Sequence, residues 1–338
     1  MKRIFAVLSA LLLTLSLCAC GAEQAQDAQL FAMDTIMDFE AYGTGAGDAL
    51  SDSKAEIIRL EKLLSRTKEN SEITKINDQA GTPTEVDAEV ASLLKSALEY
   101  SAATDGAYDI TVAPIVSAWG FIGGDYRVPS QEELNGLLKD VGYGRITLSG
   151  TTVTLGAGQS IDLGGIAKGY ASDRVAAIYA KDGVTSGMIS LGGNVWVCGK
   201  KPDGTDWRVA VQDPNDSSTY VGILSLSDAF AVTSGAYQRN FTQDGKTYHH
   251  IIDPTTGYPA ESGLTSVTIV AKNGTMSDAF STALFVAGKD KAISFWRSGK
   301  YDFDMVLVTS DNQVLVTSGI AAQFEKAEGS GYAYETIG

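Results

Sequence analysis

Apolar residues recur along the first part of the chain with two different spacings. Every second residue from Phe31 to Phe39 belongs to a mainly apolar set, which predicts a strand with one apolar face. Apolar residues from Ala55 to Leu64 recur at helical spacing. The intervening run Gly43–Asp48 is similar to a dinucleotide-binding fingerprint, but Asp48 replaces its third glycine, so a turn is the better interpretation.

Two further helices are predicted before the middle of the chain. Asp87–Thr104 carries apolar residues at helical spacing. Ser130 and Glu133 form a capping box that begins another helix, which ends near Gly142. The first half of the chain is therefore rich in helices.

Strand signals dominate the middle of the chain, and helices return near its end. Leu148–Thr152 is a predicted hairpin turn, and Gly187–Val270 contains short strands separated by Gly, Asp, Asn and Pro. Helical periodicity returns in Met276–Ala287 and in Asp290–Ser298, and Met305–Val316 predicts a closing hairpin.

Because strands and helices occupy separate runs, the α+β class is favoured over a doubly wound parallel sheet. The sequence contains no repeat and no interior linker. We expect a single two-lobed domain over residues 30–338, with mainly antiparallel sheets flanked by helices.

The N-terminus has the layout of a secretory signal. Two basic residues precede an apolar run, residues 4–17, that is shorter than the roughly 20 residues needed to span a bilayer. We expect residues 1–19 to be removed as a lipoprotein signal, because the sequence before Cys20 resembles a lipobox. Cysteine is unusual at the position of Cys18, two residues before the modified cysteine. The alternative is an ordinary cleaved signal that leaves Cys20 free.

A lipid on Cys20 predicts an extracytoplasmic protein anchored to a membrane, with residues 20–29 as a flexible tether. Loss of residues 1–19 changes the formal charge from −15 to −17, which argues against nucleic acid or anionic lipid as a partner. Cys198 is then the only cysteine in the folded part, so its core must stabilise it without an intramolecular disulfide.

A glycine pair within Ile161–Tyr170 is a candidate phosphate site. Gly164 and Gly165 precede a predicted helix, whose N-terminus favours anions, and Lys168 can neutralise a phosphate oxygen. A tight strand-to-helix turn with a surface lysine explains the same local pattern equally well.

Two oxygen-bearing residues lie four apart in the predicted helix Met276–Ala287. Asp278 and Thr282 therefore share one helix face, and a carboxylate with a hydroxyl suits Mg²⁺. No His or Cys lies nearby in the sequence for zinc. Taken alone, Asp278 near a helix start is more simply explained as a partner for backbone N–H groups.

His249 and His250 are the only histidines of the chain. On a strand they face opposite sides, so only one of them can point into a given site. Pro254 and Gly257 then predict a turn that leaves Asp253 at the strand end. A histidine here is either a base or a packing residue, and packing is the simpler explanation.

Three aromatic residues flank a short polar segment earlier in the chain. Tyr108, Trp119 and Phe121 lie beside Asp109 and Gly120. They can stack on a flat ring, although core packing is the default for such residues.

Taken in order along nearly the whole mature chain, these segments resemble the ApbE family of FAD:protein FMN transferases. A series in this order is highly specific. One departure is Asp34, where members of the family usually have glycine. The segments that carry the resemblance are Met33–Thr35, Asp105–Asp109, Trp119–Phe121, Asp162–Asp173, Gly192–Asn194, Thr233–Gly235, His250–Pro259 and Asp278–Thr282.

The resemblance implies a role for individual residues. It implies an Mg²⁺ ion held by Asp278, Thr282 and the main-chain carbonyl of Gly165. It implies His250 as the catalytic histidine, with the carboxylate of Asp253 as the other candidate for proton removal. The FAD contacts that it implies are Met33, Ala107, Tyr108, Asp109, Asp162, Lys168 and Ile252.

The implied reaction transfers FMN from FAD to a threonine hydroxyl of a flavoprotein subunit in a membrane redox complex and releases AMP. Mg²⁺ and Lys168 then stabilise the phosphate oxygens, and base catalysis is the smaller contribution. An FAD-binding lipoprotein and an FAD pyrophosphatase that yields FMN and AMP are the alternatives. A flavin electron carrier is less favoured, because nothing in the sequence suggests a nicotinamide site or a partner redox centre.

Overall fold

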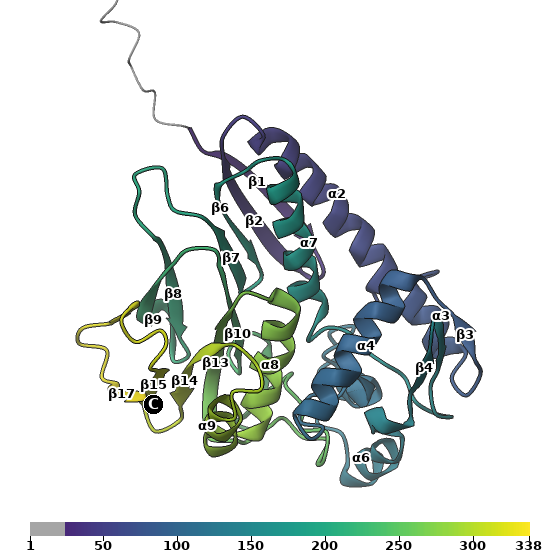
Figure 1. Cartoon of the computed structure of the whole chain (residues 1–338). Helices are drawn as coiled ribbons and strands as arrows, with labels where there is room; N and C mark the ends of the chain where they lie inside the picture. The colour runs from purple at the N-terminus through teal and green to yellow at the C-terminus, as the bar shows by residue number, and fades with distance from the viewer. Residues whose placement is uncertain (1–23) are drawn as a thin grey trace, which may run out of the picture.

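The computed structural model describes residues 24–338, which form one large sheet with helices on one face and a smaller sheet on the other (Figure 1). Neighbouring strands of the large sheet are antiparallel, except for the last two, which are parallel. In spatial order its strands are β1 (Gln26–Ala32), β2 (Thr35–Tyr42), β6 (Ser186–Leu191), β7 (Asn194–Cys198), β10 (Ala229–Gly235), β13 (Leu264–Ala271), β14 (Asp304–Thr309), β15 (Gln313–Thr317) and β17 (Ala333–Ile337).

One face of the large sheet is covered by α2 (Ala46–Leu64), α7 (Ala167–Lys181) and α8 (Gly274–Ala287). α9 (Lys289–Arg297) follows α8 directly. A second, smaller lobe lies beside these helices (Figure 1). It consists of α3 (Glu72–Asp78), α4 (Ala88–Ala103), α5 (Ala113–Ala118), α6 (Gln131–Leu137), and a small sheet of β3 (Thr84–Glu85), β5 (Thr152–Thr154) and β4 (Thr147–Ser149).

The other face of the large sheet packs against a second sheet. That sheet consists of β16 (Phe324–Lys326), β9 (Asp216–Leu226) and β8 (Trp207–Asp213). Side chains alternate between faces along a strand, so Met305 and Leu307 of β14 face the helices while Val306 and Val308 face the second sheet. Both faces of β14 are buried, which explains its continuous apolar run.

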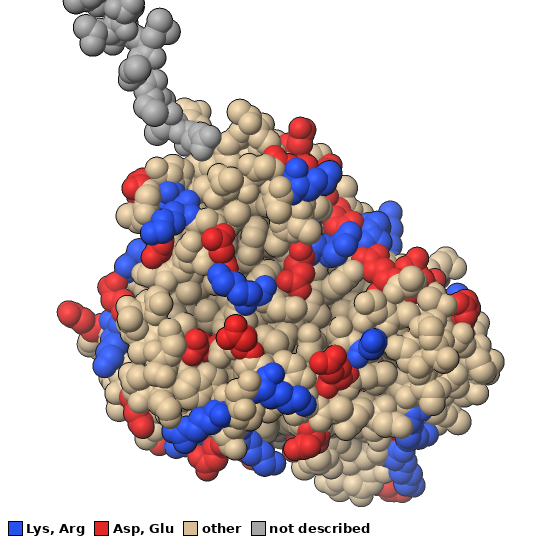
Figure 2. Space-filling model, viewed as in Figure 1, with Lys and Arg blue, Asp and Glu red and all other residues tan. Residues whose placement is uncertain are grey.

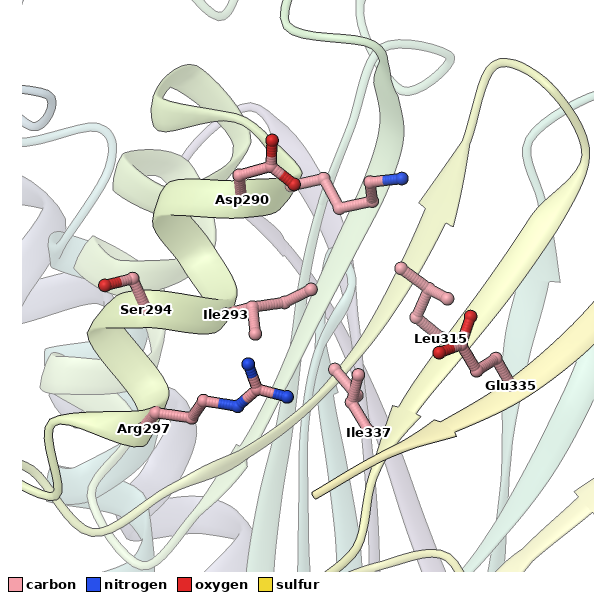
Figure 3. Close-up of a pocket in the computed structure, with 8 residues that line it drawn as sticks. Asp290, Ile293, Ser294, Arg297, Leu315, Glu335 and Ile337 are labelled. Atoms are coloured by element: carbon pink, nitrogen blue, oxygen red, sulfur yellow. The ribbon is translucent and has the colours of Figure 1, made fainter.

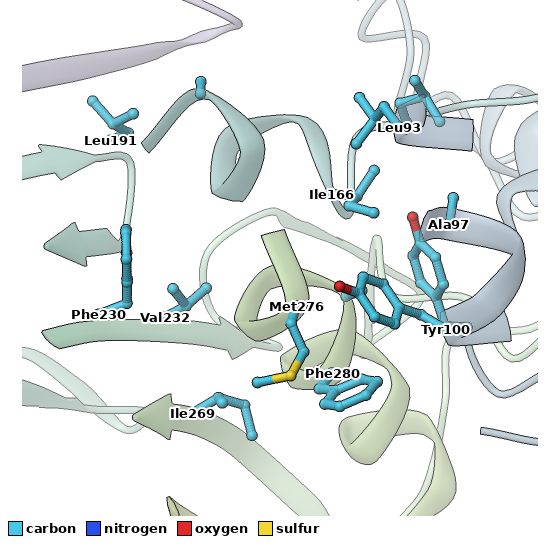
Figure 4. Packing of buried hydrophobic residues seen from close by; sticks show 14 of the residues in the cluster. Leu93, Ala97, Tyr100, Ile166, Leu191, Phe230, Val232, Ile269, Met276 and Phe280 are labelled. Carbon is cyan, nitrogen blue, oxygen red and sulfur yellow. The ribbon is translucent and has the colours of Figure 1, made fainter. Parts of the chain in front are cut away.

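α8 lies at the centre of the helical layer, between the large sheet and α4. Figure 4 shows Met276 and Phe280 of α8 packed among buried residues that include Ile269 of β13 and Tyr100 of α4. The Tyr100 and Phe280 rings meet edge to face with centroids 5.3 Å apart. This packing fixes α8 on two sides, and the residues discussed below depend on its position.

A separate apolar cluster joins the smaller lobe to the hairpin of β11 (Asn240–Gln243) and β12 (Lys246–His249). Trp119 and Phe121 are fully buried in it, and the Trp119 indole N–H donates to the carbonyl of Gly257 at 2.8 Å. These two rings therefore pack in a core, as their default interpretation predicted.

The α+β class and the single domain are confirmed, and so are most of the predicted elements. Asp87 caps α4 by accepting the N–H of Glu89 at 2.7 Å. Ser130 caps α6 in the same way, accepting the N–H of Glu133 at 3.2 Å. The Glu133 carboxylate pairs with Arg127 instead of returning to Ser130, so only half of the predicted capping box forms.

The predicted strand over residues 31–39 is wrong, because β1 and β2 form a hairpin that turns at Met33 and Asp34. Both turn residues have left-handed backbones, with φ of 48° and 59°. The turn inverts the alternation: Phe31 pairs with Ile36 on the exposed face, whereas Met37 is buried on the other face. β1 begins at Gln26, so residues 26–29 of the predicted tether belong to a strand.

The predicted signal segment and Cys20 lie outside the described residues. Across residues 24–338, no helix is both long and apolar enough to cross a membrane. Acidic and basic side chains are interspersed over the face seen in Figure 2.

Candidate functional site

Two glycines let α7 and α8 cross at very short range. A Cβ atom placed on Gly169 would lie 2.2 Å from the carbonyl oxygen of Gly274 and 2.6 Å from Cβ of Asp278. Because no side chain fits there, the backbone N–H of Gly169 reaches the Asp278 carboxylate and donates to its Oδ2 at 2.8 Å. The crossing therefore places Asp278 directly against the first turn of α7.

Asp278 is a buried carboxylate, 4% exposed. Burial raises its pKa, and the Lys168 ammonium and the Gly169 N–H act in the opposite direction by stabilising the charged form. The side-chain amide of Asn194 also lies beside this carboxylate, but outside hydrogen-bonding geometry. A buried negative charge with incomplete hydrogen bonding is suited to a cation.

Thr282 and Gly165 complete the predicted metal-ligand set. A Cβ on Gly165 would lie 3.5 Å from Oγ1 of Thr282 and 3.2 Å from the Tyr108 ring, so the turn before α7 lies against α8. Asp278 stands one helical turn from Thr282. The structure thus brings together the carboxylate, the hydroxyl and the glycine turn. In the sequence, Gly165 lies 113 positions before Asp278 and 117 positions before Thr282.

Two buried polar atoms at this place have no partner among the described residues: the Tyr108 hydroxyl and Nδ2 of Asn194. Burial raises the pKa of Tyr108 well above its usual range, and the charges of Asp278 and Asp162 add to this effect. The hydroxyl is therefore a neutral donor. Orphaned donors beside oxygen ligands fit a site for a hard cation together with an anionic group.

The predicted metal-ligand set contains a single carboxylate. Within residues 24–338, no three His, Cys, Asp or Glu side chains gather closely enough to hold a metal ion. Asp278 is therefore the charged member of a set whose other members are neutral oxygens. Such a set suits an ion that also binds phosphate oxygens of a ligand.

The glycine turn differs from the predicted phosphate cradle. The N–H of Gly164 donates to Oδ1 of Asp162 at 2.9 Å, and those of Ile166 and Ala167 donate to the carbonyl of Leu163. These groups are already paired, so the tight-turn interpretation holds for this stretch of backbone. Positive charge must come from Lys168 instead.

Lys168 acts electrostatically on two predicted site residues. Its charge opposes the rise in the pKa of Asp278 and adds to the fall in the pKa of His250. A single ammonium group is therefore close enough to act on the predicted metal ligand and on the predicted catalytic histidine.

Asp162 is held in place by a residue that sequence analysis missed. Nη1 of Arg66 lies 3.4 Å from Oδ2 of Asp162 and donates to the carbonyl of Ala113 at 3.0 Å. Asp173 was also missed as a residue with a role of its own. Its carboxylate accepts the N–H groups of Gly274 and Thr275 at 2.7 and 2.8 Å, which secures the start of α8 against α7.

The segment Ala107–Asp109 offers Tyr108 to the site while Asp109 is used internally. Oδ1 of Asp109 accepts the N–H and the hydroxyl of Thr111 at 2.8 and 2.6 Å, and its Oδ2 accepts the N–H of Tyr143 at 2.8 Å. The Ala107 N–H bonds to the carbonyl of Thr104. Asp109 therefore shapes the turn that positions Tyr108.

The two histidines face different surroundings, as predicted. His249 lies edge to face with Phe285, a packing role, and its Nε2 is 3.2 Å from the carbonyl of Ala260. Nδ1 of His250 is 3.1 Å from the carbonyl of Arg239. A carbonyl only accepts, so Nδ1 carries the proton and Nε2 is the free acceptor.

Burial lowers the pKa of His250 to about 3, since the Arg239 carbonyl compensates only in part and Lys168 adds to the depression. The imidazole is therefore neutral near pH 7. It accepts a proton weakly, which limits it as a base.

Asp253 builds the turn that follows His250. Its Oδ1 accepts the N–H and the hydroxyl of Thr255 at 2.8 and 2.7 Å, and its own N–H donates to the carbonyl of Tyr258 at 2.9 Å. Ile252 is buried and bridges to Pro259. The carboxylate predicted to remove a proton thus has a structural use.

Met33 stands at the tip of the β1–β2 hairpin, where its N–H donates to the Glu61 carboxylate of α2 at 2.8 Å. A left-handed Met is uncommon, and such residues cluster at functional sites. The turn between β6 and β7 lies against this hairpin, because a Cβ atom on Gly192 would lie 2.5 Å from Oγ1 of Thr35. Asp34 is also left-handed, which explains why glycine suits that position.

An open cavity lies elsewhere, between α9 and strands β15 and β17 (Figure 3). It has a volume of about 480 Å³ and contains none of the predicted site residues. Arg297 and Glu335 line it, so its charges are mixed. The candidate site is the α7–α8 crossing.

Comparison with known proteins gives a consistent result. The ApbE family model matches residues 33–307. The FAD:protein FMN transferase of Haemophilus influenzae is 30% identical over 336 residues, which cover 94% of this chain and 97% of that protein. The FAD:protein FMN transferase of Vibrio cholerae is 32% identical over 275 residues, which cover 78% and 82%.

Solved structures agree. The ApbE protein of Thermotoga maritima matches with a TM-score of 0.80 and 35% identity, covering 90% of this chain and 97% of that one. The flavinyl transferase ApbE of Pseudomonas stutzeri matches with a TM-score of 0.76 and 28% identity, covering 85% and 92%. These similarities define an enzyme of the transferase class. The chain belongs to the ApbE family.

Proposed function

We propose that this protein is a Mg²⁺-dependent FAD:protein FMN transferase that attaches FMN to a threonine hydroxyl of a flavoprotein subunit and releases AMP. The observation that carries the proposal is the buried Asp278 carboxylate, which lies beside Thr282, the Gly165 turn and the Lys168 ammonium. The names of the relatives support FMN transfer from FAD.

Asp278, Thr282 and the carbonyl of Gly165 would hold Mg²⁺, which neutralises charge on the pyrophosphate and orients it. Lys168 would supply a second positive charge for the pyrophosphate oxygens. The Tyr108 hydroxyl is a neutral donor that has no partner within residues 24–338, so it is available to a phosphate oxygen.

In the reaction, the threonine oxygen forms a bond to the phosphorus of the FMN part. The bond from that phosphorus to the bridging oxygen breaks, and AMP leaves with the bridging oxygen. Nε2 of His250 accepts the threonine proton as the hydroxyl attacks. Because His250 is a weak base, charge neutralisation at the phosphates contributes more than proton removal.

We further propose that lipid on Cys20 anchors the enzyme outside the cytoplasm, near subunits of membrane redox complexes. The described domain begins its first strand at Gln26, close behind that residue. Mass spectrometry of the protein from its native host tests this. An unmodified N-terminus downstream of Cys20 would contradict it.

The function is tested by incubating the protein with FAD, Mg²⁺ and a purified flavoprotein subunit. Intact mass should show a gain of one FMN on the subunit, with AMP released in equal amount. A subunit whose acceptor threonine is changed to alanine should gain nothing. AMP released at an undiminished rate without any subunit would identify a pyrophosphatase, and bound FAD with no AMP would identify a binding protein.

A further inference from the structure

A chain of hydroxyl groups connects β10 to the metal-ligand face of α8. The Ser281 hydroxyl donates to the backbone carbonyl of Asp278 at 2.8 Å. Oγ of Ser234, on β10, lies 2.8 Å from Oγ of Ser281 and 3.1 Å from Oγ1 of Thr282. Ser281 is fully buried and Ser234 is 9% exposed, so water competes little for these contacts.

The direction of every hydrogen bond in this chain is determined by its end. A carbonyl has no proton, so the Ser281 proton must point to Asp278. Each hydroxyl has one proton, so the contact between Ser234 and Ser281 must use the proton of Ser234. The contact between Ser234 and Thr282 must then use the proton of Thr282. This is the arrangement that places a proton in each contact.

The hydrogen bond that a helical threonine hydroxyl usually makes is not available to Thr282. A helical threonine commonly donates its hydroxyl to the carbonyl four residues earlier, which here is that of Asp278. That carbonyl already accepts the helical N–H of Thr282 and the hydroxyl of Ser281, so both of its lone pairs are used.

We propose that Ser234 and Ser281 are positioning residues that turn the Thr282 proton toward β10 and leave the oxygen lone pairs of Thr282 free for the metal ion. This inference rests on the proposed function, in which Thr282 is a metal ligand. A neutral hydroxyl binds a cation only through a lone pair, so a fixed proton direction preorganises the ligand.

The test measures metal binding without substrate. Mn²⁺, which suits the same oxygen ligands as Mg²⁺, is titrated into the protein and followed by electron paramagnetic resonance, with Mg²⁺ as competitor. Ser234→Ala should weaken binding about 2- to 12-fold, the value of one neutral hydrogen bond. Ser281→Ala should weaken it less, and in the same direction.

Ser277→Ala is the matched control, because Ser277 is buried on the same helix and donates to the carbonyl of Asn273 outside the chain. It should leave Mn²⁺ affinity unchanged. Ser234→Ala combined with Thr282→Ala should bind no more weakly than Thr282→Ala alone, because the hydroxyl to be oriented is gone.

The outcomes separate this inference from the proposed function. If Thr282→Ala weakens Mn²⁺ binding while Ser234→Ala and Ser281→Ala bind as the wild type, the positioning role is overturned and the metal site stands. If Thr282→Ala binds Mn²⁺ as the wild type, the proposed ligand set itself is wrong. Should Ser234→Ala fail to fold, Ser281→Ala decides, because it breaks the same chain from its other side.

Discussion

The Lys168 charge acts on both the α7–α8 crossing and the segment that follows β12. The two regions differ in how completely their polar groups are compensated by neighbouring groups. At the crossing, burial raises the pKa of Asp278, and its neighbours stabilise the charged carboxylate only in part. In the other segment, His250 is neutral and bonded to a carbonyl, and Asp253 is satisfied by its own turn.

This difference indicates where the catalytic free energy originates. Burying an incompletely compensated charge destabilises the folded protein, and a bound cation offsets that cost. The crossing is therefore suited to binding a cation that stabilises charge in the transition state. A neutral, satisfied segment contributes shape and one weak acceptor. We therefore expect substitutions at the crossing to affect the rate more than substitutions after β12.

The largest effect is expected for Asp278→Ala, which removes the charged ligand. Transfer of FMN at fixed Mg²⁺ should fall by roughly 10³-fold or more, because the loss corresponds to several kcal/mol of charge stabilisation. Thr282→Ala should be milder, since a neutral hydroxyl holds a hard cation less strongly. Equal residual rates for Asp278→Ala and His250→Ala at saturating Mg²⁺ would place the metal elsewhere.

Lys168→Ala should weaken FAD binding by roughly 10- to 150-fold, the value of a charge-assisted hydrogen bond of about 1.5–3 kcal/mol. Riboflavin, which has no phosphate, should bind almost unchanged, and fluorescence titration measures both. Lys181→Ala is the control, because Lys181 lies exposed at the far end of α7. Equal losses of affinity for FAD and riboflavin would show that Lys168 contacts the flavin ring and not the phosphates.

His250→Ala should lower the rate by only about tenfold, because a base whose pKa is about 3 removes a proton poorly. The rate should show no inflection from this group between about pH 5 and 8. A rate that rises with a midpoint near pH 6.5 and loses this step in His250→Ala would contradict the depressed pKa.

The same pKa predicts a dependence of stability on pH. Between about 3 and 6.5 the unfolded chain binds a proton at His250 and the native protein does not. Stability therefore falls as the pH drops below 6.5. His250→Gln should reduce the loss of thermal stability between pH 7 and 5, as followed by circular dichroism.

The smallest effect is expected for Asp253→Ala, which should lower the free energy of unfolding by about 1–2 kcal/mol through two lost hydrogen bonds. Asp253→Asn keeps an oxygen acceptor for the Thr255 N–H, so it should recover most of the stability. Full activity in Asp253→Asn would confirm a turn-building role. A stable but inactive Asp253→Asn would restore the catalytic interpretation.

Local patterns predicted α4 and the hairpin of β4 and β5, because capping, helical periodicity and turn residues lie within a few positions of each other. The β1–β2 hairpin escaped this logic, since Met33 and Asp34 are not the Gly or Asn that announce such a turn. The hydrogen bond from the Gly164 N–H to Asp162 could have been predicted from the sequence, because an aspartate two residues before a glycine commonly closes an Asx turn.

Other parts of the site had no local signal. Arg66 and Asp162 are 96 positions apart, and neither stands in a pattern that names the other. The proximity of Ser234 to Thr282 depends on how α8 packs on the sheet, which periodicity does not specify. Resemblance to a family supplied what spacing did not, namely which oxygen groups meet.

The contact between Gly169 and Asp278 has a consequence for the order of folding. The two residues are 109 positions apart, and Asp173 meets Gly274 across 101 positions. Such long loops close late, because their entropy is lost before any contact rewards it. A nascent or C-terminally shortened chain that lacks α8 therefore lacks the proposed metal ligands Asp278 and Thr282, and affinity for Mn²⁺ would report that α8 has docked.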